Sequence, residues 1–358
     1  MRITDSFPEG SDNRVVSWVP GHLAGTRRHF VTVSVRRRQV VFRDAIYNFA
    51  SDRRASVAMI GVYGEGTVLW RPRARERWRK DLTCGWRNAG IADVVFSRRG
   101  AVWRCSHQVS VLLRADDLRR HGTTQVIVGW RKAGRQRSVI GTLSGGGSLL
   151  VYERGINDYG DKQSPPPDGL FRLSGRRSQQ IPHSKGLSLL DVAQGVIAAK
   201  APNGSVALLR PNGVRVRTLL FSARAVTAAR IAGKRLAVVD RGRLRLLDTV
   251  TGATIARLAL RRGEGPPPVL SGVQGGLAVY TAGVALHLLR ISDGRDVILR
   301  TPKIGSGLEA RLGPRGLIYV YNAAYSRYSG RLQFVPWHEL LRALAIERPE
   351  SGPARPRP

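Results

Sequence analysis

Leu246-Leu247-Asp248-Thr249-Val250-Thr251-Gly252 is the stretch that decides the fold, because the chain repeats its pattern at nearly constant intervals. Each copy has a Leu-Leu or Leu-Phe pair, one polar residue, a turn that ends in glycine, and then a second strand-like run. The other copies are residues 170–175, 208–213 and 288–294. The turn glycines fall 38, 39 and 42 residues apart, at Gly175, Gly213, Gly252 and Gly294. This spacing indicates an array of similar structural units.

Each unit is long enough for four short strands, as the one around Gly252 illustrates. Its strand-like runs are separated by turns that contain glycine or aspartate, and they lie at residues 226–229, 236–239, 244–247 and 254–258. Short strands joined by tight turns form an antiparallel meander, and no helical periodicity interrupts this one. About 40 residues for each four-stranded unit is typical of a β-propeller blade, so we predict an all-β propeller.

The same pattern can be laid over most of the 358 residues, which predicts about seven four-stranded blades. The units cover residues 49–82, 91–128, 138–182, 187–221, 225–260, 269–300 and 307–337. The second and third units fit the pattern least well, which leaves six or eight blades as alternatives. The last unit has only three runs, so an N-terminal strand, either 39–42 or 30–35, is expected to complete it and close the ring.

The two ends of the chain depart from this pattern. Residues 1–35 have weak periodicity and are expected to be poorly ordered, so the propeller is assigned to residues 36–337. Residues 338–358 are assigned to a short helix and a tail rich in proline, glycine and arginine, which is expected to be disordered. The helix should pack on the outside of the ring, because apolar side chains recur at helical spacing at Trp337, Leu340, Leu341 and Leu344.

The run from Leu246 through Gly252 to Ala256 resembles a known signature of strand, aspartate, small turn, Thr-Gly and strand. That signature belongs to the WD40-like, quinoprotein-like and YVTN-type propeller superfamily. As a repeat pattern the resemblance covers most of residues 49–337, although only this blade matches closely. The Gly-His and Trp-Asp dipeptides of WD40 blades, and the regular tryptophan of quinoprotein blades, are absent from these units. The resemblance implies the fold, which hosts many functions, and no quinone cofactor.

The chain is strongly basic, since 59 Lys and Arg residues against 25 Asp and Glu give a net charge of +34. A charge of this size attracts nucleic acids and other polyanions. The arginines are nevertheless spread along nearly the whole chain, and the tightest groups, at 36–38 and 71–80, are short. A base composition that favours arginine codons would produce the same scatter. Nucleic-acid binding is therefore an alternative, and an unspecific one.

Catalytic motifs are not apparent in the sequence. It lacks a Gly-x-Ser-x-Gly elbow, a phosphate-binding P-loop and a His-Glu-x-x-His zinc motif. The seven histidines show no ligand spacing, and we interpret His287, inside a predicted strand, as a satisfied structural residue. The glycines at 145–147 precede a strand, whereas a phosphate loop leads into a helix. No catalytic residue, metal ligand or cofactor is assigned, and a lactonase-like propeller hydrolase with a channel metal remains an alternative.

Two long connections break the rule of tight turns, one in the third unit and one in the last. Both combine tyrosine with arginine and asparagine, which are favoured at binding surfaces. Each joins the second and third strands of its blade, so both should emerge on one face of the ring. Unconstrained drift in loop length would explain them equally well. The candidate binding residues are Tyr152, Arg154, Asn157, Tyr159, Tyr321, Asn322, Tyr325, Arg327 and Tyr328.

Cys84 and Cys105 are the only cysteines, too few to build a zinc site alone. Cys84 precedes the first strand of the second unit and Cys105 ends its second strand, and these two positions should emerge on the same face of the ring. The two form a disulfide candidate, with two free thiols as the alternative. The sequence shows no secretory leader and no transmembrane run, so the compartment is unknown. A bridge would indicate an extracytoplasmic location.

These observations favour a non-enzymatic β-propeller that acts as a binding or scaffold protein through loops on one face of the ring. The expected partner is a protein or an anionic ligand, and the chain is expected to be a monomer. The alternatives are the propeller hydrolase and a polyanion-binding propeller driven by the positive charge.

Overall fold

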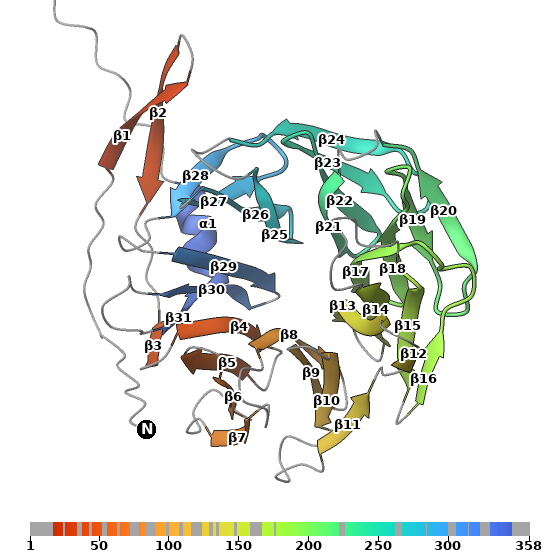
Figure 1. Ribbon diagram of the computed structural model, residues 1–358. Helices are drawn as coiled ribbons and strands as arrows, with labels where there is room; N and C mark the ends of the chain where they lie inside the picture. Colours follow the sequence, from red (N-terminus) through yellow and green to blue (C-terminus); the bar gives the residue numbers. More distant parts are fainter. Residues whose placement is uncertain are drawn as a thin grey trace, which may run out of the picture.

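The computed structural model is a β-propeller, as predicted, in which the described strands form seven sheets arranged in a ring (Figure 1). It describes residues 17–23, 26–33, 38–42, 45–51, 56–62, 65–71, 79–83, 90–97, 100–106, 110–115, 124–128, 132–133, 136–146, 149–157, 167–174, 177–221, 226–261, 267–283, 285–299, 306–313, 315–322 and 330–345. The sheets match the seven units expected from the repeat, and in each blade the first full-length strand lies nearest the centre of the ring.

The first three blades follow one another along the chain. Blade 1 contains β4 (Ala45–Ser51), β5 (Ser56–Val62), β6 (Glu65–Arg71) and β7 (Arg79–Thr83). Blade 2 contains β8 (Gly90–Ser97), β9 (Gly100–Ser106), β10 (Ser110–Ala115) and β11 (Thr124–Val128). Blade 3 contains the short β12 (Lys132–Ala133), β13 (Gln136–Gly146), β14 (Leu149–Asn157), β15 (Gly169–Ser174) and β16 (Arg177–Gln180).

Blades 4, 5 and 6 carry the clearest copies of the repeat. Blade 4 contains β17 (Ser188–Ala193), β18 (Val196–Lys200), β19 (Val206–Leu209) and β20 (Arg215–Leu219). Blade 5 contains β21 (Val226–Ala232), β22 (Arg235–Asp240), β23 (Arg243–Asp248) and β24 (Thr254–Ala259). Blade 6 contains β25 (Val269–Gln274), β26 (Leu277–Ala282), β27 (Ala285–Arg290) and β28 (Asp296–Leu299).

Blade 7 is completed by a strand from the start of the chain, which closes the ring as predicted. Strands β29 (Ser306–Gly313), β30 (Gly316–Asn322) and β31 (Gly330–Pro336) pair in order, and β3 (Arg38–Phe42) is added next to β31. The antiparallel register places Gln39 opposite Gln333 and Phe42 opposite Gly330. Of the two candidate closing segments, 39–42 is therefore the one used.

A further hairpin lies within residues 1–35, the segment expected to be poorly ordered. Strands β1 (Ser17–Leu23) and β2 (Thr26–Val33) pair with each other, and β2 also pairs in parallel with β28 of blade 6. Thr32 lies opposite Ile298 and Val33 opposite Leu299. The second candidate closing segment thus covers the outer edge of blade 6 rather than completing blade 7.

The leucine pair of the repeat is buried because both faces of a blade are covered by neighbouring blades. Successive residues of a strand point to opposite faces of the sheet. In blade 5, Leu246 packs in the core shared with blade 6, and Leu247 packs in the core shared with blade 4. The pairs at 208–209 and 288–289 divide in the same way, with the first leucine toward the following blade. The repeated Leu-Leu is thus a contact between consecutive blades.

The turn of the repeat is held by its polar residue and its glycine. In blade 5, the Asp248 carboxylate accepts hydrogen bonds from the backbone N–H groups of Val250 at 2.8 Å and Thr251 at 2.7 Å. These two bonds hold the pKa of Asp248 below its ordinary value. Gly252 has a φ of +75° and donates its N–H to the Asp248 carbonyl at 2.9 Å. The left-handed conformation explains why glycine ends this turn.

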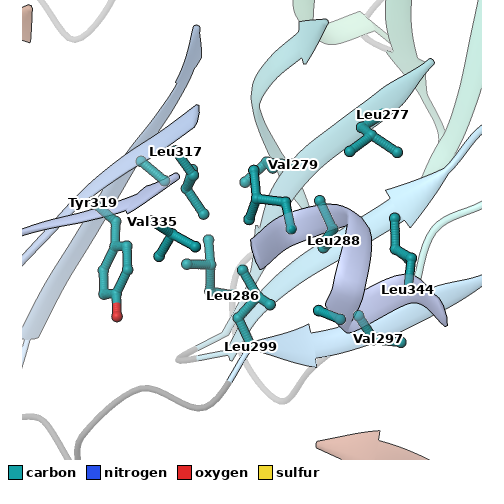
Figure 2. Close-up of a cluster of buried hydrophobic side chains, with 13 residues drawn as sticks. Leu277, Val279, Leu286, Leu288, Val297, Leu299, Leu317, Tyr319, Val335 and Leu344 are labelled. Carbon is teal, nitrogen blue, oxygen red and sulfur yellow. The ribbon is translucent and has the colours of Figure 1, made fainter. Parts of the chain in front are cut away.

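The C-terminal helix α1 (Trp337–Ala345) packs into the core between blades 6 and 7. Figure 2 shows Leu344 of this helix close to Leu288 and Val297, with Leu317 and Val335 of blade 7 on the other side of the cluster. The predicted apolar stripe is wrong at one position, since Leu341 is 47% exposed. Ala343 is buried in its place, because the helix is covered by the flanks of two blades rather than by one flat surface.

Candidate binding surface

Of the predicted binding residues that lie at the surface, Arg154 is the one whose contacts the structure describes most fully. It lies in β14, and its guanidinium carbon is 4.2 Å from the centroid of the Phe171 ring on the neighbouring strand β15. Its Nε donates to the Asp168 carboxylate at 3.3 Å, and both side chains are about one third exposed. Aromatic stacking and an ion pair therefore fix the direction of a partly exposed guanidinium.

Tyr152 lies in the core and not in a loop, which corrects its predicted placement. Strand β14 continues to Asn157, so the connection begins six residues later than expected. The Tyr152 side chain is 2% exposed, stacks on Phe171 with ring centroids 5.5 Å apart, and shares a hydrogen bond with the Ser178 hydroxyl. Burial raises the pKa of Tyr152 above its ordinary value. Its role is to pack the outer half of blade 3.

The C-terminal end of the blade 3 connection is tied to the segment that leads into blade 4. The Gly186 N–H donates to the Pro167 carbonyl at 2.9 Å, and Gln180 Nε2 donates to the Asp168 carbonyl at 3.1 Å. The buried Ser184 hydroxyl accepts from the Leu170 N–H at 3.0 Å. These bonds join the end of one long connection and the next inter-blade segment into one continuous surface. Asn157 ends β14, and Tyr159 lies outside the described residues.

A pocket of about 430 Å³ opens beside this surface, where blades 3 and 4 meet. One wall is His183, in the segment between blades 3 and 4, a non-glycine residue with a φ of +56°. Its wall from blade 4 is the repeat turn and the start of β20, with Gly213 close to Pro182. The lining residues are His183, Asn212, Gly213, Val214 and Arg215. The pocket contains an arginine, an imidazole and an amide, and its lining includes no carboxylate.

Sequence reasoning did not assign these pocket residues to a site. In the sequence, the turn at 210–213 indicates only the repeat, and His183 is one of seven scattered histidines. The sequence signal that could have located this site is the repeat turn itself. The repeat turns of blades 5 and 6 also pack on the outermost strand of the preceding blade. Gly252 lies near Arg217, and Gly294 lies near Leu258. In blade 4 this turn lines a pocket together with a histidine.

The second predicted loop is anchored as expected, although its centre lies outside the described residues. Tyr321 and Asn322 are the last residues of β30, and β31 begins at Gly330. Both predicted loops therefore join the second and third strands of their blades, which places their ends on the same face of the ring. The remaining residues of this loop prediction, Tyr325, Arg327 and Tyr328, fall in the segment that is not described.

His287 belongs to a buried polar cluster between blades 5 and 6, which confirms its interpretation as a structural residue. Its Nδ1 lies 3.1 Å from Asp296 Oδ1, and its ring stacks on Tyr280 with centroids 4.6 Å apart. The Tyr280 hydroxyl donates to Asp296, and Arg261 Nε lies 3.1 Å from the same carboxylate. Burial raises the pKa of Tyr280 well above its ordinary value, and the Asp296 charge adds to this.

The inner strands are joined by a second carboxylate that links three blades. Asp191 on β17 accepts the Ile231 N–H of blade 5 at 2.7 Å and the Ser144 hydroxyl of blade 3 at 3.3 Å. The Ser144 hydroxyl in turn accepts the Val192 N–H at 3.1 Å. Asp191 and Asp296 are therefore committed to holding blades together. Within the described ranges, no three His, Cys, Asp or Glu side chains are grouped to hold a metal ion.

Only one of the two cysteines of the disulfide candidate lies within the described residues. Cys105 lies near the end of β9, the second strand of blade 2, where it was expected, and Cys84 lies outside the described residues. Among the helices of the described ranges, none has the length and apolar character needed to cross a membrane.

Comparison with known proteins supports the fold. No family model and no curated protein sequence matches the chain. Among solved structures, a chain of a structure described as the Mitotic Checkpoint Complex is similar, with a TM-score of 0.51 and 14% identity over 82% of this chain and 89% of that chain. Hsv2 of Kluyveromyces marxianus gives a TM-score of 0.48 with 12% identity over 78% of this chain and 89% of that chain. Hsv2 of Kluyveromyces lactis gives 0.46 with 12% identity, over 78% and 90%. The likeness to the chain of the Mitotic Checkpoint Complex structure agrees with the β-propeller fold.

Proposed function

We propose that this chain is a non-enzymatic propeller that binds another protein through the face carrying the connections between second and third strands. The observation that supports this most directly is the fixed base of the blade 3 connection. Arg154 is oriented by Phe171 and Asp168, and the returning end is hydrogen-bonded to the segment before blade 4. A long connection on a rigid base can present side chains with little loss of conformational entropy on binding.

The buried carboxylates hold neighbouring blades together, which supports a binding role over a catalytic one. Asp191 and Asp296 are both hydrogen-bonded across blade boundaries. The similar solved structure is, by its description, a complex, which agrees with a propeller that works by contacting other proteins. Because the two predicted loops belong to blades 3 and 7, which are well separated around the ring in Figure 1, a partner that used both would have to span the mouth of the channel.

Site-specific photo-cross-linking tests this proposal. A photoreactive phenylalanine is placed at Tyr159 or Tyr325, in the two loops, or at Val250 as a control. Val250 is 61% exposed in a turn between third and fourth strands, on the opposite face of the ring. The proposal expects both loop positions to cross-link the same protein and the Val250 position not to do so. Cross-linking at Val250 alone, or equally at all three positions, would contradict it.

A second candidate function is general polyanion binding, which is favoured by the net charge of +34. Contacts with phosphate or sulfate groups weaken steeply with salt because bound counterions are released. On this reading the protein should elute from heparin only at high salt, and several single arginine substitutions should each lower the elution point slightly. If one substitution abolished retention, the interaction would be local rather than general.

A further inference from the structure

The outer edge of blade 4 differs from that of blade 3 in its exposed apolar side chains. It differs from that of blade 5, where Ile255 is 48% exposed, in having arginine at 210 where the repeat turn of blade 5 has Asp248. Strand β20 is the last strand of its sheet, so its outer side has no strand partner among the described residues. Three of the exposed large apolar side chains lie on or beside it, with Val214 55%, Val216 41% and Leu220 79% exposed. The residues of β16 at 178–180, on the outer edge of blade 3, are instead Ser, Gln and Gln. An unpaired edge with apolar side chains is a template for strand addition.

The chain itself shows that an outer edge of this propeller accepts another strand. In blade 6, the corresponding outermost strand β28 is paired in parallel with β2, through Thr32 opposite Ile298 and Val33 opposite Leu299. Blades 4 and 6 are built on the same repeat, with the outermost strand following the same glycine turn. Addition of a strand to β20 would therefore repeat, in blade 4, an arrangement that already exists in blade 6.

The positive charge around β20 favours an incoming strand with acidic side chains. Arg215 begins the strand and is exposed, Arg217 follows two residues later, and His183 lies across the pocket from Arg215. The Arg217 Nε atom is buried and has no hydrogen-bond partner. The turn and the outermost strand of blade 4, residues 210–219, contain no acidic residue. An incoming strand that carries carboxylates would therefore meet complementary charge at the start of β20 and no like charge along it.

We propose that the outer edge of β20 binds an extended acidic segment of another protein by strand addition. Backbone hydrogen bonds to β20 would provide the pairing, and apolar side chains of the segment would cover Val216 and Leu220. One carboxylate of the segment would enter the pocket between Arg215 and His183, where about 430 Å³ is open. The proposal goes beyond the function proposed above, because it concerns the outer edge of blade 4 rather than the loops of one face.

The test uses the full-length protein and short fluorescent peptides, with binding followed by fluorescence anisotropy at near-physiological salt. The first peptide alternates valine with glutamate, the second alternates valine with lysine, and the third is the first with alternate backbone nitrogens methylated. The glutamate peptide should bind, and the other two should not. Methylation removes the backbone donors without changing charge, so equal binding of the methylated peptide would overturn strand addition.

Charge reversal at the site provides the matched control. Arg215→Glu should weaken binding of the glutamate peptide by at least about tenfold, a change of about 1.4 kcal/mol, and should allow the lysine peptide to bind. Arg243→Glu changes the net charge equally at an exposed position of blade 5 and should have little effect. If both variants weaken binding alike, or if heparin of equal charge displaces the peptide from both equally, general polyanion attraction explains the result and the proposal fails. If wild type dimerises and Arg215→Glu does not, the edge pairs two copies of this chain, which also overturns the proposed occupant.

Discussion

Removal of the Asp296 carboxylate should destabilise the contact between blades 5 and 6 more than any exposed substitution nearby. Its side chain is 6% exposed and receives the Tyr280 hydroxyl, His287 Nδ1 at 3.1 Å and Arg261 Nε at 3.1 Å. Asp296→Ala would leave three polar groups without this acceptor, in a site from which water is largely excluded. Loss of one partner of a buried charged network costs about 3–5 kcal/mol.

The conservative variant should fall between wild type and alanine. Asp296→Asn keeps one carbonyl oxygen as an acceptor and has nearly the same shape, so we expect a loss of about 1–3 kcal/mol. The matched control is Asp293→Ala in the adjacent turn, where the carboxylate pairs with Arg290 but is 46% exposed. Exposed ion pairs contribute little, so this change should cost less than about 1 kcal/mol.

Urea denaturation followed by far-ultraviolet circular dichroism measures these differences. The free energy of unfolding should decrease in the order wild type, Asp293→Ala, Asp296→Asn and Asp296→Ala. The near-ultraviolet signal should also change in the Asp296 variants, because Tyr280 stacks on His287 beside this carboxylate. A loss below about 1 kcal/mol for Asp296→Ala would refute the reasoning, since the three donors would then have found other partners at little cost.

Four further predictions concern pH, turn geometry and ring closure. The pKa of Tyr280 is raised in the fold, so stability should fall as pH rises above about 10, where the unfolded tyrosine ionises; Tyr280→Phe should flatten this alkaline loss in pH-dependent melting. Arg290 lowers the pKa of Asp293 from 3.8 to about 2, so its contribution is present above pH 4 and is lost as pH falls toward 2; a carboxyl titration by NMR with a midpoint near 3.8 would contradict this. Gly213→Ala should cost about 1–3 kcal/mol more than Gly233→Ala in chemical denaturation, because both have positive φ but only at Gly213 would the new Cβ lie 2.7 Å from Pro182. Deletion of residues 1–44, which removes β3 and leaves β4 whole, should lower the melting temperature sharply; an unchanged value would show that blade 7 does not need β3.

The sequence determined the architecture because the repeat encodes contacts that each blade makes in the same way. The leucine pair specifies a strand that is covered on both faces of its blade. The polar residue and the glycine specify a turn that ends in the left-handed conformation, and both features follow from local chemistry. Leu246 and Leu247 pack toward opposite neighbours, and Gly252 takes the positive φ that its turn requires. The last unit is one strand short, which predicted closure by an N-terminal strand, 39–42 or 30–35, because an unpaired blade edge is unfavourable.

The tertiary structure alone decided which residues share a site, since that depends on contacts between blades. Tyr152 looked like a loop residue in the sequence, but β14 is longer than its apolar run and carries Tyr152 into the core. His183 and Arg215 are 32 residues apart, the first in the segment between blades 3 and 4 and the second in blade 4, and the pocket forms because the turn of blade 4 packs on that segment. A repeat pattern describes what the blades have in common. A site arises where neighbouring blades differ, and such differences do not recur at a fixed interval that the sequence could reveal.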